Sequence, residues 1–173
     1  MPFSLYDATV ASFQQGLVAL DAILGRALTH FQQQGTPLRD IVDARLAPDM
    51  LPLSFQVVSA AHHSIGALSA ARQGLFRPPS PPDGLDFASL QSLVAQAREG
   101  LDLLGCDEVN ALEGTDMVFQ LGERRLPFLA EDFLLSFSVP NFYFHTTTAY
   151  DLLRLHGMPL GKRDYLGRLR LKA

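Results

Sequence analysis

Apolar positions follow a helical period over most of the chain. Between residues 5 and 34 they recur every three or four positions, and Gly35 ends the run. This spacing is typical of an amphipathic helix that buries one face. Ser4 and Asp7 form a capping pair at its start. The same period predicts three further long helices, over residues 50–73, 86–104 and 139–156, and short helical pieces over 38–45 and 131–137.

Boundary signals accompany each of these predicted helices. Asp49 is placed to cap the second helix, and Asp86 to cap the third. The last helix has Ser138 as a candidate cap and Pro140 in its first turn, where the missing N–H removes no hydrogen bond. Between the second and third helices, the proline-rich residues 77–84 can continue neither a helix nor a central strand. They predict a stiff, extended connector.

The period changes from 3.6 to 2 between residues 115 and 129. Such alternation around the turn at 122–124 predicts a β-hairpin with one buried face, formed by Phe119, Leu121, Leu126 and Phe128. Pro127 cannot donate to a neighbouring strand and belongs on an outer edge. The predicted fold is all-α, with four long helices and a small hairpin inserted before the last one.

Length and composition fit one domain over residues 1–173, and no apolar run is long enough to span a membrane. The N-terminus lacks the features of a secretory signal, and Cys106 is the single cysteine, which we interpret as structural. We therefore expect a cytoplasmic protein. Residues 160–173 form a basic arm of net charge +4, against −8 on the other 159 residues, which favours docking onto the chain's own body over nucleic-acid binding.

Histidines are the candidate chemical groups. His145 shares the apolar stripe of the last helix with Phe142, Ala149 and Leu152, so its imidazole is expected in the core. A buried imidazole can be a structural hydrogen-bonding group, a metal ligand or a proton carrier, and the structural role is the commonest. In the second helix at most one of the adjacent His62 and His63 can face inward. Periodicity alone favours His62, through its alignment with Val58, Ala61, Ile65 and Leu68.

Three segments, at residues 46–57, 140–145 and 161–167, resemble an uncharacterised bacterial family, a domain of unknown function in the DinB-like (DinB/YfiT-type) superfamily. The resemblance implies an up-down-down-up four-helix bundle, often dimeric. It also implies a divalent-metal site of three histidines, one on the second helix and a His-x-x-x-His pair on the last. Carried onto this sequence, the ligands are His63 and His145, but the third position holds Ala149. The resemblance thus favours His63 where periodicity favours His62.

Two functional hypotheses follow. The first is a homodimeric binding or structural module whose metal site is absent or degraded, so that no cofactor is expected. The alternative is a metal-dependent transferase acting on a small thiol or electrophile, with His63 and His145 as ligands of a divalent metal. His62, Asp49, Tyr143 and Tyr150 are candidate partners for the ring nitrogens. Simpler interpretations are that Asp49 is a helix cap and that the two tyrosines pack against the core with their hydroxyls in solvent. In the arm, we expect Lys162, Arg163 and Asp164 to hold the tail against the bundle or a dimer mate.

Overall fold

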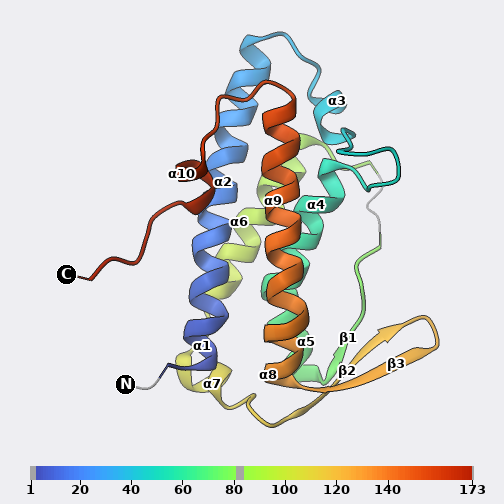
Figure 1. Ribbon diagram of the computed structural model, residues 1–173, viewed down its shortest axis with the longest axis vertical. Coiled ribbons are helices and arrows are strands. Elements are labelled where there is room, and N and C mark those ends of the chain that lie inside the picture. Colours follow the sequence, from blue (N-terminus) through green and yellow to red (C-terminus); the bar gives the residue numbers. More distant parts are fainter. Residues whose placement is uncertain (1–2, 81–83, 173) are drawn as a thin grey trace.

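The computed structural model describes residues 3–80 and 84–172 of the chain. It is mostly helical, with a small three-stranded sheet at one end (Figure 1). Its α-helices are α1 (Leu5–Ala8), α2 (Val10–Gln33), α3 (Leu38–Val42), α4 (Leu53–Ala61), α5 (Ala67–Gln73), α6 (Phe87–Asp102), α7 (Cys106–Asn110), α8 (Ala130–Phe133), α9 (Val139–Leu155) and α10 (Lys162–Leu166). Two π-helical segments are η1 (His62–Gly66) and η2 (Leu134–Ser138), and the strands are β1 (Leu75–Phe76), β2 (Asp116–Leu121) and β3 (Arg124–Leu129).

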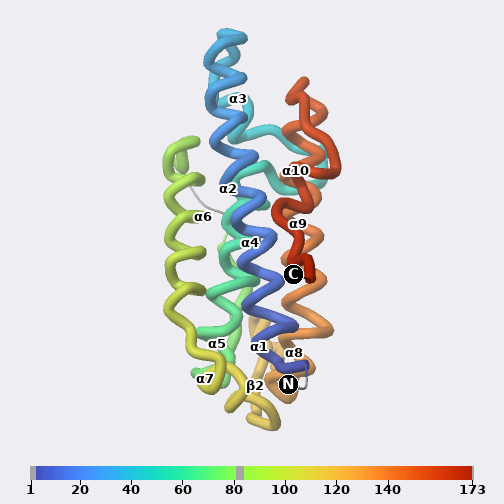
Figure 2. The backbone as a smooth tube through the Cα atoms, turned by 90° about the vertical axis from the view of Figure 1, so that its left-hand side faces the viewer, coloured from blue at the N-terminus to red at the C-terminus, as the bar shows by residue number. Residues whose placement is uncertain are grey.

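The long helices enclose one hydrophobic core. Helix α2 packs against α6 and α9, which lie on either side of it in Figure 2, and α4 packs against the same two helices. The core is filled mainly by apolar side chains that the helical period places inward, together with Phe76 of strand β1. Its largest side chains are Phe13, Phe31, Phe76, Phe133 and Phe142. The predicted helical fold with an inserted hairpin is therefore confirmed. No helix of the described residues has the length and hydropathy needed to cross a bilayer.

The first two predicted helices differ in detail from the structure. The first is interrupted at Thr9, whose hydroxyl donates a hydrogen bond to the carbonyl of Leu5 at 2.7 Å. The second begins at Leu53, directly after Pro52, so the prediction that Asp49 caps it is wrong. Asp49 lies exposed in the preceding loop. This helical run continues to Gln73, but the π turn η1 interrupts its middle and widens the turn that carries both histidines.

The last helix starts earlier than predicted. At Ser138 the backbone is already helical (φ −71°, ψ −46°), so α8, η2 and α9 form one continuous run from Ala130 to Leu155. Pro140 cannot donate the usual helical hydrogen bond, and the π turn just before it accommodates this loss inside the run. Ser138 is consequently not a cap, and its hydroxyl is available for a bond to another helix.

The predicted hairpin is present, with Val118 opposite Pro127 and β3 at the edge of the sheet. Only its base is buried, because the tip projects away from the helices (Figure 1) and leaves Leu121 and Leu126 exposed. Strand β1 pairs in parallel with β2 and was not predicted, since two residues are too few to show a period. Residues 77–80 lie outside regular structure, as expected of the connector, and its residues 81–83 are not among the described ones.

Candidate functional site

Two imidazoles meet inside the bundle where η1 packs against α9. His63 comes from η1 and His145 from α9, and their side chains are only 4% and 9% exposed. The ring centroids lie 5.7 Å apart and the ring planes differ by 17°, so the rings are stacked. The structure therefore brings together the two histidines that the resemblance selected, and it places His63 rather than His62 in the interior.

Aromatic side chains surround this pair on both sides. The His63 ring lies 5.3 Å from the ring of Phe76 and 5.6 Å from that of Phe137. The His145 ring lies 5.9 Å from Phe55 and 5.3 Å from Phe144, both in edge-to-face geometry. Such contacts add packing energy but offer no charge to balance a proton on either imidazole.

The tautomer of His145 follows from its hydrogen bonds. Its Nδ1 lies 2.8 Å from Oε1 of Gln56, which is 2% exposed. The amide nitrogen of Gln56 in turn donates to the carbonyl of Leu51 at 2.8 Å, which orients the amide oxygen toward the ring. Because that oxygen can only accept, Nδ1 of His145 must carry the proton, and Nε2 keeps its lone pair. The residue that orients His145 is thus Gln56, not one of the predicted partners.

A buried serine joins η1 to the last helical run. The Ser138 hydroxyl donates to the backbone carbonyl of His63 at 2.9 Å and lies 3.4 Å from its Nδ1. Carbonyls lose their regular partners where a π turn interrupts an α-helix, so this bond satisfies a group that the interruption exposes. Ser138 is fully buried and holds the His63 segment in place.

Burial keeps both imidazoles neutral. Burial, together with repulsion from His145 and from His62, lowers the pKa of His63 to about 3. Burial likewise lowers the pKa of His145 to about 4. At neutral pH the site is therefore a pair of uncharged rings, chemically able to accept a proton or a metal ion but holding neither charge nor a strong base near pH 7.

The remaining residues do not complete a metal site of the three-histidine kind. Ala149 lies one turn beyond His145, fully buried, and carries no ligand atom. Among the residues that the structure describes, His, Cys, Asp and Glu form no cluster of three or more able to hold a metal ion. Two imidazoles without a third protein ligand do not match the three protein ligands of a catalytic zinc site. The residues present therefore do not fit the metal that the superfamily resemblance implies.

The other predicted partners lie elsewhere. Nε2 of His62 lies 2.7 Å from the carbonyl of Arg77, and its ring packs 4.6 Å from Phe76, at the edge of the core. Asp49 is exposed in its loop. Tyr143 lines a separate cavity, and Tyr150 packs edge-to-face on Tyr165. Within the described part of the chain, none of these four hydrogen-bonds to His63 or His145.

Gln56 and Ser138 were missed, yet each carries a signal in the sequence. Gln56 precedes His63 by seven residues, and Ser138 precedes His145 by seven. Two helical turns put such pairs on one face, so each polar residue faces the same side as the buried histidine of its own helix and can bind the histidine of the facing helix. Ser59 lies on the same stretch between Gln56 and His63. Its hydroxyl is the one buried side-chain polar atom without a hydrogen-bond partner among the described residues.

The fold and site define a helical protein with a buried pair of neutral histidines. The model of a family described as a domain of unknown function (DUF1993) matches residues 5–166, so the chain belongs to that family. The chain is also similar to the crystal structure of a DinB family member protein from Shewanella denitrificans. The TM-score is 0.78, with 28% identity over 98% of this chain and 95% of the other. A comparison with curated proteins gives no significant match.

Proposed function

We propose that this protein is a DinB-like binding module that works without a resident catalytic metal, and that its two histidines form a structural pair. The observation that carries this proposal is Ala149. A histidine four residues after His145 would supply a preorganised chelate on one helix, and alanine cannot. Gln56 binds Nδ1 of His145, Ser138 holds the backbone of His63 and lies 3.4 Å from its Nδ1, and aromatic rings flank both imidazoles, so each ring has a structural environment that needs no metal.

Metal content tests the proposal directly. The full-length protein, purified without chelator and without a metal-affinity step, should contain far less than one zinc, nickel or iron per chain by mass spectrometry. A matched preparation of His145→Gln should give the same low value. Close to one metal ion per wild-type chain, lost in His145→Gln, would overturn the proposal and restore the alternative of a metal-dependent transferase. That alternative needs a third ligand near both imidazoles, which no described His, Cys, Asp or Glu supplies.

We further propose that the module is a homodimer with the up-down-down-up helix order of its superfamily. Exposed leucines on the hairpin and on η2 support a contact surface at this end of the bundle, namely Leu121, Leu126, Leu129 and Leu135. Light scattering on the eluting protein should give twice the mass of one chain, and Leu126→Asp should halve it. A monomeric wild type would contradict this part. The cytoplasmic location stays a prediction.

A further inference from the structure

A second site lies on the opposite side of α9 from the histidine pair, beneath the C-terminal arm. Helix α2, helix α9 and the arm enclose a cavity of about 120 Å³. Its floor is apolar and includes Leu20 and Ile23 of α2, while Leu166 of the arm covers it. The arm was expected only to dock onto the bundle, and that role does not explain the cavity beneath it.

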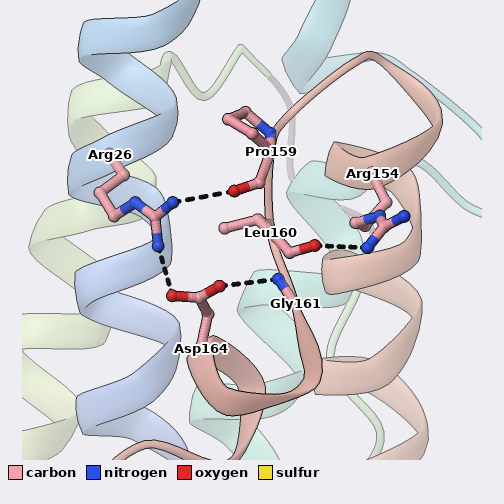
Figure 3. Close-up of polar contacts among 6 residues, drawn as sticks. All are labelled: Arg26, Arg154, Pro159, Leu160, Gly161 and Asp164. Atoms are coloured by element: carbon pink, nitrogen blue, oxygen red, sulfur yellow. Dashed lines mark hydrogen bonds and ion pairs between the residues drawn. The ribbon is translucent and has the colours of Figure 1, made fainter.

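Hydrogen bonds and an ion pair hold the arm over the cavity. Arg26 of α2 forms an ion pair with Asp164 and donates to the carbonyl of Pro159 at 2.9 Å (Figure 3). Asp164 also accepts from the backbone N–H of Gly161 at 2.7 Å. Beside the cavity, Gln15 donates to the carbonyl of Leu166 at 2.9 Å. These bonds hold the arm over α2 on both sides of the cavity without filling it.

Close approach of the arm depends on small residues. Gly167 ends α10 with φ +61°, a conformation that favours glycine. A Cβ at this position would lie 3.1 Å from Cβ of Ala19, which is tighter than ordinary packing. A side chain on Gly167 would therefore lift the arm, and larger side chains at Ala19 would fill the cavity. Gly167 thus lets the arm cover the cavity, and the small side chain of Ala19 leaves the cavity unfilled.

Two side chains of the cavity wall, Tyr165 and Arg170, can donate hydrogen bonds to an anion. Tyr165 accepts a hydrogen bond from the Thr147 hydroxyl at 2.8 Å, and its own proton reaches the Thr146 oxygen only at 3.5 Å, the outer limit of a hydrogen bond. A carboxylate oxygen is a stronger acceptor than a hydroxyl, so the phenolic proton can turn to such a ligand. Arg170 lines the same cavity, and within the described residues it makes no ion pair. None of the described residues that line the cavity is acidic.

We propose that this cavity binds a small monocarboxylate with a compact apolar body. The carboxylate lies between the Arg170 guanidinium and the Tyr165 hydroxyl, and the apolar body lies on Leu20 and Ile23. A dry protein cavity of about 150 Å³ holds one benzene molecule, so the apolar body has about four to six carbons. This inference deepens the proposed binding role and rests on it, but it involves none of the histidines.

The test uses the full-length protein and defined probes. Isovalerate and benzoate are titrated by calorimetry and by ligand-detected NMR, with isoamyl alcohol and isoamylamine as uncharged and cationic counterparts. We expect binding of the carboxylates, with the alcohol at least about tenfold weaker and the amine not bound, because a charge-assisted bidentate contact is lost. Arg170→Gln should weaken isovalerate at least about tenfold, and Tyr165→Phe about threefold to tenfold.

Arg168→Gln is the matched control, because Arg168 belongs to the same arm but does not line this cavity. It should leave isovalerate affinity unchanged. Absence of carboxylate binding at millimolar concentration, equal binding of the alcohol, or equal loss in the Arg168 and Arg170 variants would each overturn the inference. The metal measurement separates the two proposals: a metal-free protein that binds no carboxylate refutes only the cavity.

Discussion

The imidazole of His63 stacks on that of His145 with 5.7 Å between ring centroids, and neither ring has a carboxylate partner among the described residues. Protonating either ring places a positive charge beside its neighbour in an apolar site. Two buried, stacked bases of this kind make the fold sensitive to acid, because the unfolded chain accepts protons that the folded chain resists.

The free energy of unfolding should therefore fall as the pH drops below about 6.5. The pKa values of His63 and His145 are lowered to about 3 and about 4 in the fold, so between these values and 6.5 the unfolded state binds more protons. The stability is fully present above pH 6.5, and its loss by pH 4 should be on the order of several kcal/mol. Urea denaturation at a series of pH values measures this slope.

A matched pair of variants shows which histidine causes the pH dependence of the free energy of unfolding. His63→Phe should make the slope clearly shallower, since phenylalanine suits the aromatic surroundings and cannot be protonated, and only the contribution of His145 is left. His156→Gln changes an exposed histidine at the end of α9 and should leave the slope as in the wild type. Equal slopes in wild type and His63→Phe would show that carboxylates elsewhere control the acid response.

The helix faces were largely predictable from the sequence, but the choice between two adjacent histidines was not. Apolar periodicity correctly buried His145. It favoured His62 over His63 because it took Val58 and Ala61 as the inward face of the second helix. The structure buries Val57 and Ala60 instead and leaves Val58 and Ala61 half-buried, so the inward face is the one that includes His63. Only the superfamily pattern chose His63.

Ser138 illustrates the second limit. A serine two residues before a proline is typical of a helix start, and the sequence does not show that another helix carries a free carbonyl opposite it. In the structure that carbonyl belongs to His63, 75 residues away in sequence. The packing partner therefore decided between a cap and a helix interior. The strand β1 and the cavity under the arm also depend on such long-range contacts, so no local pattern predicted them.

Two glycines of α2 should respond oppositely to alanine. A Cβ on Gly16 would lie 2.6 Å from the ring of Phe142, which is fully buried and cannot retreat. Gly16→Ala should lower the free energy of unfolding by about 1–3 kcal/mol through overpacking. A Cβ on Gly25 meets nothing within 4 Å, so Gly25→Ala should raise it by about 0.5–1 kcal/mol. Thermal and urea denaturation of both variants measures these changes. Equal destabilisation by the two substitutions would contradict the close contact between α2 and α9.

The arm should loosen when Asp164 loses its charge. Asp164→Asn removes the ion pair with Arg26 and weakens the bond from Gly161, so amide hydrogen exchange over residues 160–167 should quicken. The bundle should melt at nearly the wild-type temperature, because an exposed ion pair contributes only about 0–1 kcal/mol. Lys162→Gln is the control, as Lys162 forms no ion pair among the described residues. Unchanged exchange in Asp164→Asn would show that the ion pair does not hold the arm.

A third imidazole should turn the histidine pair into a metal site. In Ala149→His the new side chain lies one turn after His145 on the same face of α9, the spacing that lets two imidazoles chelate one ion. Ala149 is fully buried, so the larger side chain should first cost about 1–3 kcal/mol of stability. Added zinc should then raise the melting temperature of this variant, because it binds the folded state alone. Ala149→Leu is the matched control: it carries a similar steric cost and no ligand atom, so zinc should leave its melting temperature unchanged. If zinc stabilises the wild type as much as Ala149→His, the alanine has not removed a ligand, and the interpretation of the pair as metal-free is wrong.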